Sequence, residues 1–331
     1  MVQSISIFAE ESFLLSSTGL YKNMANHQIA DGVDEYDVQY PLWSDGVLKR
    51  RWIKIPAETK IDTSNGNWWK FPVGTKLWKE FSYLKDGSLK RIETRFIHHT
   101  PNGWIFSTYL WDKNDFEALK SNGNEYPNYV DLGSRVTHSI PSNDACLVCH
   151  QDKNNESPVL GFSALQLAHQ KRGLNLNELR KKNLLTHSLP DNISIKSHTS
   201  EGAKAMGLIH GNCSHCHNPR GIGSESTMNL KHDIYNTLAE NENAYVTTFN
   251  QESRYAFPDF QVSFKRILPG NAEASILYRR IKASNHNDIF YNEKMPPGAY
   301  GTMTINNELS ESLFKWIESM TKNLKVRRTN F

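Results

Sequence analysis

The stretch Thr199–His217, TSEGAKAMGLIHGNCSHCH, is the part of the chain from which its architecture is best argued. Its first two residues are good helix N-caps, and the segment 199–210 has the apolar spacing of a helix. The helix leads directly into Cys-Ser-His-Cys-His. Cys-x-x-Cys-His is the attachment pattern of a c-type haem, in which two thioethers hold the porphyrin and the histidine binds the iron. We therefore expect Cys213 and Cys216 to carry a haem and His217 to be its axial ligand.

The same pattern occurs a second time, as Cys146-Leu147-Val148-Cys149-His150. The chain has four cysteines, so the two motifs use all of them and leave none for a disulfide. The sequence thus predicts two covalently bound haem c groups. The first is expected at Cys146 and Cys149, with His150 as its iron ligand.

Two other uses of paired cysteines stay open at this point. A zinc ribbon places its two Cys-x-x-Cys halves about 15–20 residues apart, whereas residues 151–212 separate the motifs here. A four-cysteine zinc site also gives no reason for the histidine that ends both motifs. Dithiol redox chemistry needs only one motif, next to a βαβ pattern. Haem attachment explains more of the pattern than either alternative.

The second haem has a candidate for its other axial position. Met295 stands directly before Pro296 and Pro297, and two prolines stiffen the loop that would hold its thioether against the iron. The remaining methionines lack this context, and Met206 and Met320 fall on apolar helical faces. Ligation by His217 and Met295 would raise the haem potential and suit electron transfer.

The first haem has no evident distal ligand. A backbone carbonyl near Pro158 is expected to accept the Nδ1 proton of His150 and to fix its ring. The segment Leu189-Pro190 stands where a Met-Pro loop could have been, but leucine cannot bind iron. The candidate histidines are His169, which ends a short predicted helix, together with His138 and His187, and His98 and His99 farther upstream. An open sixth position would move the protein from electron carrier toward catalyst.

Upstream of the motifs the sequence predicts a β domain. Segments 49–55, 76–84, 89–99 and 104–111 are rich in aromatic and β-branched residues, and the last three read as a meander. The turns between them are predicted at 85–88 and 100–103, where glycine supplies the positive φ.

The β domain is also unusually rich in tryptophan, with seven of the eight tryptophans of the chain between residues 40 and 111. We expect most of them to be buried, because aromatic side chains dominate cores. The alternative is an exposed surface for a partner protein, a small molecule or a polysaccharide.

The predicted fold class is α+β, with a mainly antiparallel β domain followed by α-helical, cytochrome c-like haem domains. The expected domains are residues 1–135, 136–198 around the first haem and 199–331 around the second, with 112–135 as a polar loop or linker. Further helices are predicted at 163–169, 176–185, 272–283 and 307–324 from their apolar spacing.

Composition limits the function classes. The net charge of +3 is too small to argue for nucleic acid as a partner, and no apolar run approaches the ~18 residues of a membrane span. The first 18 residues lack a basic region followed by an apolar stretch. Because c-type haem is attached outside the bacterial cytoplasm, we expect a periplasmic or otherwise extracytoplasmic protein whose leader has been removed.

Several sequence blocks carry a resemblance. They are Tyr40-Pro41-Leu42-Trp43-Ser44-Asp45-Gly46, Phe71-Pro72-Val73-Gly74-Thr75-Lys76, Ile140-Pro141-Ser142, Asn212 to Pro219, and Pro269-Gly270-Asn271 through Arg280 to Met295-Pro296-Pro297. Their order over residues 15–320 resembles a family of largely uncharacterised bacterial diheme c-type cytochromes with an N-terminal Trp-rich β domain. The resemblance implies two covalent haems and supplies no substrate.

These observations leave two main functions to be distinguished. In the first, the protein transfers electrons between redox partner proteins. In the second, it is a diheme enzyme of peroxidase or oxygenase type, whose open first haem receives electrons from the second. A binding module with accessory haems is the third hypothesis.

Overall fold

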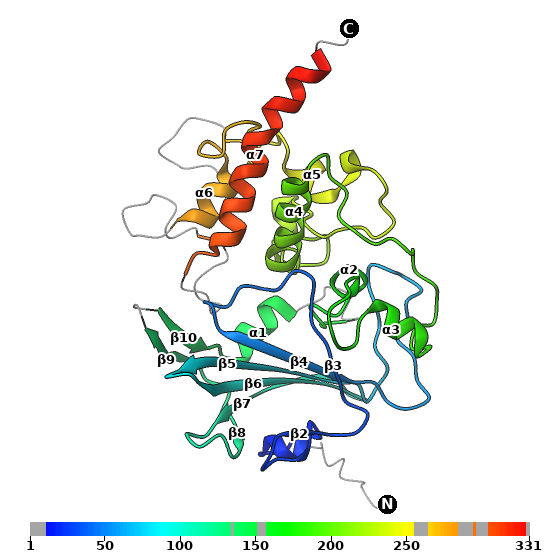
Figure 1. Cartoon of the computed structure of the whole chain (residues 1–331), viewed down its shortest axis with the longest axis vertical. Helices are drawn as coiled ribbons and strands as arrows, with labels where there is room; N and C mark the ends of the chain where they lie inside the picture. Colours follow the sequence, from blue (N-terminus) through cyan, green and yellow to red (C-terminus); the bar gives the residue numbers. More distant parts are fainter. Residues whose placement is uncertain are drawn as a thin grey trace, which may run out of the picture. The chain divides into compact units, whose positions relative to one another are not determined.

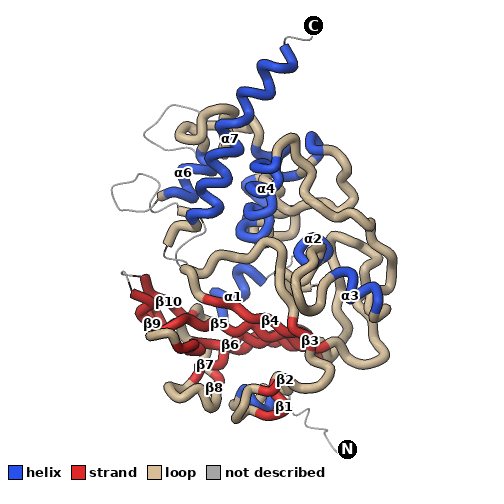
Figure 2. Tube along the Cα trace, viewed as in Figure 1, coloured by secondary structure: helices blue, strands red, loops and turns tan. Residues whose placement is uncertain are grey.

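The computed structural model describes residues 11–133, 136–150, 157–254, 264–283, 294–295 and 304–328, the last eight by their backbone alone. Two compact units contain them. We call them the sheet unit, made of residues up to 36, 47–59 and 72–124, and the haem-motif unit, made of 37–46, 60–71 and the chain from 125 onward. Most strands belong to the first unit and the helices of the C-terminal half to the second (Figure 1, Figure 2).

The sheet unit is built on one six-stranded antiparallel sheet (Figure 1). Its strands follow the chain order β3 (Asp34–Glu35), β4 (Leu48–Lys54), β5 (Lys76–Lys85), β6 (Ser88–Thr100), β7 (Gly103–Trp111) and β8 (Ala118–Lys120). The four predicted strands are β4 to β7, and the meander is confirmed. A 3-10 helix, η1 (Leu15–Thr18), and the pair β1 (Tyr21–Asn23) and β2 (Gln28–Ile29) precede the sheet.

The two tight turns of the meander have the predicted chemistry. Between β5 and β6 the loop residues are Asp86, with φ 51°, and Gly87, with φ 76°. Both angles lie in the left-handed region that two-residue hairpins with the twist of native sheets require. The turn after β6 ends at Gly103, which has φ 113°.

One core cluster of the sheet unit lies on one face of the sheet. The side chains that form it are aromatic and aliphatic: Leu15, Leu20, Tyr21, Trp52, Trp78, Phe96, Tyr109, Trp111 and Ala118. Trp78 stacks on Phe96 with ring centroids 5.3 Å apart. Burial of these rings confirms the packing role expected for the tryptophans of this unit and counts against an exposed aromatic platform built from them.

The predicted loop at 112–135 contains two strands. β8 pairs with β7, and β9 (Tyr126–Gly133) pairs antiparallel with β10 (Val136–Ile140). Most side chains of β9 are exposed or only partly buried, so the alternation of apolar and polar residues that reveals a half-buried strand is absent from its sequence.

The haem-motif unit carries most of the helices. They are α1 (Asn143–His150), α2 (Ala164–Leu167), α3 (Leu176–Lys181), α4 (Ser200–Cys213), α5 (Asn243–Thr248), α6 (Ile276–Lys282) and α7 (Asn307–Arg328), with the short 3-10 helices η2 (Ile222–Ser226) and η3 (Ala239–Asn241). The predicted helices correspond to α2, α3, α4, α6 and α7. Thr199 is the N-cap of α4, and its hydroxyl accepts a hydrogen bond from Gly202 N at 3.0 Å.

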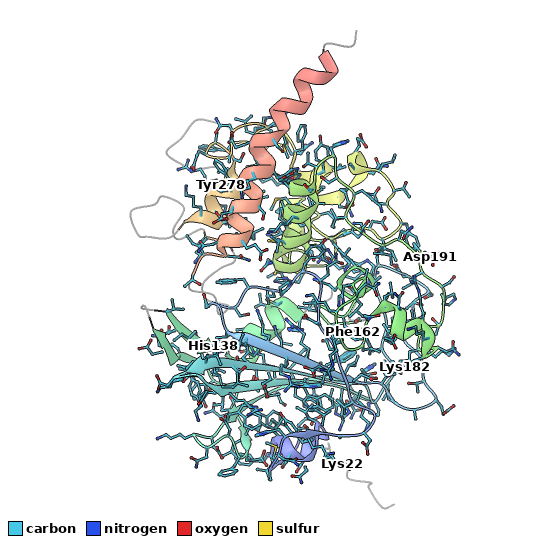
Figure 3. The ribbon with its side chains drawn as sticks, in the orientation of Figure 1. Lys22, His138, Phe162, Lys182, Asp191 and Tyr278 are labelled. Carbon is cyan, nitrogen blue, oxygen red and sulfur yellow. The ribbon has the colours of Figure 1, made fainter. Side chains whose placement is uncertain are left out.

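Helices α4 and α7 pack closely side by side (Figure 1). A Cβ at Gly202 would lie 2.7 Å from Nε1 of Trp316, so the close packing of α4 against α7 requires glycine at this position. The apolar stripe of α7, which includes Leu309, Leu313 and Ile317, is buried as predicted. On the other side of α7 the ring of Tyr278 from α6 packs 5.7 Å from that of Phe314 (Figure 3).

The α+β class is confirmed, and the division of the chain differs from the predicted one. The boundary lies near residue 124 instead of 135, and both motifs belong to one compact unit. Segments 37–46 and 60–71 also belong to the haem-motif unit, although they interrupt the sequence of the β domain. None of the helices in the described part of the chain is both long and apolar enough to span a bilayer.

Candidate functional site: two Cys-x-x-Cys-His motifs

The second motif is a tight turn at the end of α4. The backbone N–H groups of Cys216 and His217 donate to the carbonyl of Cys213 at 3.2 and 2.9 Å. The side chain of Asn218 donates to the carbonyls of Ser214, at 2.7 Å, and His215, at 3.1 Å. These bonds fix the backbone that presents both thiols and the histidine.

One proton position decides which nitrogen of His217 can bind a metal. Nδ1 lies 3.1 Å from the hydroxyl of Ser226, and that hydroxyl lies 2.6 Å from the carbonyl of Gly223. A carbonyl only accepts, so the Ser226 proton points to Gly223 and its oxygen accepts Nδ1–H from His217. The lone pair of His217 is therefore on Nε2, the arrangement in which an outer hydrogen bond orients a metal-binding imidazole.

The loop that carries Ser226 is itself fastened from outside. The guanidinium of Arg266 donates to the carbonyls of Ser226, at 2.6 Å, and Thr247, at 2.7 Å. Only 7% of Arg266 is exposed. Arg266 is therefore a structural part of the site.

Two glycines let the loop close over the motif. A Cβ at Gly221 would lie 2.2 Å from the carbonyl oxygen of Cys216, and one at Gly223 would lie 2.8 Å from Nδ1 of His217. The N–H of Gly223 also donates to the carbonyl of Cys216 at 2.9 Å. The Gly-x-Gly of this loop thus serves close backbone approach to the motif.

The protonation states suit an iron ligand. Burial lowers the pKa of His217 to about 4, and the positive charge of Arg280 adds to the effect. His217 is therefore neutral at pH 7, as a ligand must be. Burial raises the pKa of the Cys213 thiol to about 12.

The first motif occupies α1. His150, its last residue, has Nδ1 2.8 Å from the carbonyl oxygen of Pro158, so Nδ1–H donates to that carbonyl. This is the predicted contact, and it leaves Nε2 of His150 as the nitrogen with the lone pair. Residues 151–156 lie outside the described part of the chain.

The two motifs meet in space. The Sγ atoms of Cys149 and Cys216 and a ring nitrogen of His215 all lie within 4.8 Å of one another. A hydrogen bond from Cys216 lowers the pKa of the Cys149 thiol, and the same bond raises that of Cys216. In the described residues this is the group with metal-ligand spacing, and it contains neither Cys146 nor Cys213. A four-cysteine zinc site therefore does not fit this arrangement.

Met295, the predicted distal ligand of the second haem, is anchored beside α6. Its N–H donates to the carbonyl of Arg280 at 2.9 Å, and the side chain of Arg280 acts electrostatically on His217. Arg280 therefore bonds to the Met295 segment through its carbonyl and acts on the second motif through its charge. Pro296 and Pro297 lie outside the described residues.

Three of the five histidines considered for the first haem belong to the haem-motif unit, and they differ in burial and in hydrogen bonding. His169 Nε2 lies 3.0 Å from the carbonyl of Asp37, and its Nδ1 accepts from the N–H of Lys171 at 3.1 Å. Both ring nitrogens of His169 are thus in use. His187 is exposed. His138 of β10 is 2% exposed (Figure 3) and remains the buried candidate.

The segment Tyr40–Gly46, here called the strap, crosses α4. A Cβ at Gly207 would lie 2.1 Å from the ring of Tyr40, and one at Gly211 would lie 2.3 Å from its carbonyl oxygen. Small residues at positions i and i+4 of α4 therefore admit the strap. The role of this segment could not be predicted from its sequence.

The strap also forms hydrogen bonds with Asn212 of α4, directly before the second motif, and with Thr304. Trp43 N–H donates to Asn212 Oδ1 at 2.7 Å, directly before Cys213, and its indole Nε1 donates to Thr304 Oγ1 at 3.2 Å. The carboxylate of Asp45 accepts from Thr304 N at 2.7 Å and from Thr304 Oγ1 at 2.6 Å.

A buried polar network near α4 was missed from sequence. His232 Nδ1 lies 3.0 Å from Glu242 Oε2, and Glu242 Oε1 accepts from Lys196 N at 2.7 Å. The N–H of His232 donates to Nδ1 of His210 at 3.0 Å. Nε2 of His232 is buried without a hydrogen-bond partner among the described residues. A histidine and a glutamate ten residues apart give no sequence signal for such a pair.

The donor set fits covalent haem. Each motif offers two thiols and a histidine whose Nδ1 is hydrogen-bonded to a protein oxygen, which places the ring lone pair on Nε2. Comparison with known proteins adds no assignment: no protein-family model matches the chain, and neither does any curated protein or solved structure.

Proposed function

We propose that this chain is a diheme c-type cytochrome that transfers electrons between redox partner proteins outside the cytoplasm. The observation that carries the proposal is the paired second-sphere geometry. Two histidines, each ending a Cys-x-x-Cys-His motif, have Nδ1 hydrogen-bonded to a protein oxygen, the contact that orients a metal-binding imidazole. Covalent haem, when bound, supplies an iron that changes by one electron between its ferrous and ferric states.

The residues of the second site support the carrier role. His217 is held in one tautomer by Ser226, and the strap fastens α4 to the segment at Thr304. Rigid ligands keep the coordination similar in both oxidation states, which lowers the reorganisation that accompanies electron transfer. The proposed second axial ligand is Met295, which raises the potential of a His-ligated haem.

The alternative is the diheme enzyme, and one observation favours it. His169 has both nitrogens engaged and His187 is exposed, so two of the three histidine candidates are not prepared to bind opposite His150. An open position there would admit a small ligand, with the second haem as the electron source.

Absorption spectroscopy of the ferric protein separates the two functions. The electron-transfer proposal predicts two low-spin haems that do not change on addition of cyanide, and two reversible one-electron steps in a potentiometric titration. One high-spin haem that binds cyanide would contradict it and support the enzyme. The variant His138→Ala tests the remaining buried candidate, since it should convert the first haem to high spin if His138 is the ligand.

A further inference from the structure

The contact between the two motifs has a consequence for the haems themselves. In each motif the second cysteine, Cys149 or Cys216, becomes a thioether sulfur when haem is attached. That sulfur is separated from the conjugated ring by one saturated carbon. The edges of the two rings can therefore be no farther apart than the two sulfurs plus four bond lengths.

We propose that the two haems form one directly coupled pair that meets at its Cys149 and Cys216 edges, so that an electron passes between them within one chain. The proposal rests on the proposed function, because it requires both haems. Its basis is the placement of both Sγ atoms within 4.8 Å of each other. Two sequence positions separated by 66 others thus present their sulfurs to the same point.

The local structure fixes each sulfur independently. Cys216 lies in the turn in which its N–H and that of His217 bond to the carbonyl of Cys213, and its own carbonyl accepts from the N–H of Gly223. Cys149 lies in the last turn of α1, directly before His150, whose ring is held by the carbonyl of Pro158. These contacts fix the backbone at both cysteines and so place the two Cβ atoms at the contact.

His215 completes the contact. Its ring nitrogen lies within the same 4.8 Å group and hydrogen-bonds to Cys149, so a polar side chain occupies the junction between the motifs. With haem bound at both motifs, the pair would supply a one-electron exchange that needs no proton or co-reactant. Electron tunnelling falls steeply with distance, and the Cys149–Cys216 contact would offer a short path between the two sites.

Proximity is tested first in the haem-free full-length chain, made without haem attachment and kept reduced with a chelator present. A short bifunctional thiol-alkylating reagent should join residues 149 and 216 in the variant C146A/C213A, which keeps only those two thiols. The matched control C149A/C216A keeps two thiols outside the contact and should not be bridged. Separate alkylation in C146A/C213A, or equal bridging in the control, would overturn the proposal.

Coupling is tested in the haem-loaded protein by circular dichroism in the Soret region. A directly coupled pair predicts a bisignate band, replaced by a single-signed band in C213A/C216A, which retains only the first attachment site. A protein with two haems and a single-signed band would overturn the coupled pair and leave the diheme function intact. A protein that binds no haem would overturn the function, and with it the coupled pair.

Discussion

At the scale of single residues, the site depends on where protons and lone pairs are placed. The hydroxyl of Ser226 gives its proton to the carbonyl of Gly223 and so has to accept from His217. The carbonyl of Pro158 imposes the same tautomer on His150. Two unrelated loops thus produce one result, a histidine with its proton on Nδ1 and its lone pair on Nε2.

Replacement of Met295 by alanine tests the proposed distal ligand. We expect the sulfur-to-iron charge-transfer band to disappear and the potential of that haem to fall, because a thioether ligand favours the ferrous state. The matched control is Met320→Leu, which removes a buried sulfur from α7 at nearly constant volume and should leave the band in place. An unchanged spectrum in Met295→Ala would show that another group binds the iron.

Replacement of Glu242 by glutamine tests the buried polar network. Glu242 is 1% exposed and accepts from both Lys196 N and His232 Nδ1. Loss of one charged acceptor from buried partners should lower the free energy of unfolding by about 1–3 kcal/mol, measured by chemical denaturation. Glu240→Gln, at an exposed ion pair with His198, should change it by less than about 0.5 kcal/mol. Equal losses of unfolding free energy in the two variants would show that the buried network stabilises the fold no more than the exposed ion pair does.

The two motifs could be recognised in the sequence because their spacing is chemically specific, whereas the residues that hydrogen-bond to them mostly could not be predicted. Pro158 was found because it follows His150 at a distance that a short loop can close. Ser226, Arg266 and Glu242 are common residue types far from the motifs, and only folding brings them there. The hydrogen bonding of His169 could not be predicted, because its carbonyl partner, Asp37, lies more than a hundred residues away in the sequence.

At the scale of elements, the strap connects the helix before the second motif to the segment after the Met295 loop. Trp43 bonds to Asn212 at one end and to Thr304 at the other, and Asp45 bonds twice to Thr304. We interpret the strap as a positioning element that sets the distance between the proximal and distal sides of the second site.

Replacement of Asp45 by asparagine tests this role. Asparagine tolerates the left-handed φ of 53° found at this residue, but it loses the charge that strengthens both bonds to Thr304. In the haem-loaded protein the charge-transfer band should be lost at a lower pH than in the parent protein, because hydroxide or a lysine then displaces the thioether more easily. Asp31→Asn, at an exposed ion pair in the sheet unit, should leave that pH unchanged. The same transition pH in both variants would refute the positioning role.

The sheet unit has a row of like charges across three strands. Arg51 pairs with Lys79, and Lys79 pairs with Arg95 on the next strand. Burial, followed by repulsion from Arg51, Lys49 and Arg95, lowers the pKa of Lys79 well below its usual value. Such a pairing is destabilising while Lys79 carries its proton.

Replacement of Lys79 by methionine should therefore stabilise the protein at pH 7, by about 1–2 kcal/mol. The unfolded chain holds the Lys79 proton up to its ordinary pKa, about 10.4, and the folded chain releases it earlier. Unfolding free energy of the parent protein should accordingly rise with pH between these two values, and the rise should be smaller in Lys79→Met. Lys90→Met, at an exposed position of the same sheet, should keep the slope. A steeper slope in Lys79→Met would contradict this reasoning.

Strands were predictable where one face is buried. In β4 to β7 the enrichment in aromatic and β-branched residues indicated strands, and the glycines marked the turns. The strands β8 and β9 were missed because their side chains are mostly exposed or their length is three residues. The local sequence also could not show that residues 37–46 and 60–71 belong to the haem-motif unit. Their place in that unit depends on contacts with α4 and with residues beyond 180.

At the scale of the whole molecule, the two motifs belong to one compact unit and share a junction at Cys149, His215 and Cys216. The sequence suggested two consecutive haem domains. The structure instead places both motifs in one compact unit, with one cysteine of each motif in a shared cluster.

The attachment of two covalent haems to one chain is tested most directly by the intact mass of the full-length protein. The chain should be exported by a host that attaches c-type haem and denatured before measurement. We predict a mass that exceeds the polypeptide by two haem groups, and by one in each of the variants C146A/C149A and C213A/C216A. A polypeptide of unmodified mass, obtained while a known c-type cytochrome matures in the same host, would contradict the account.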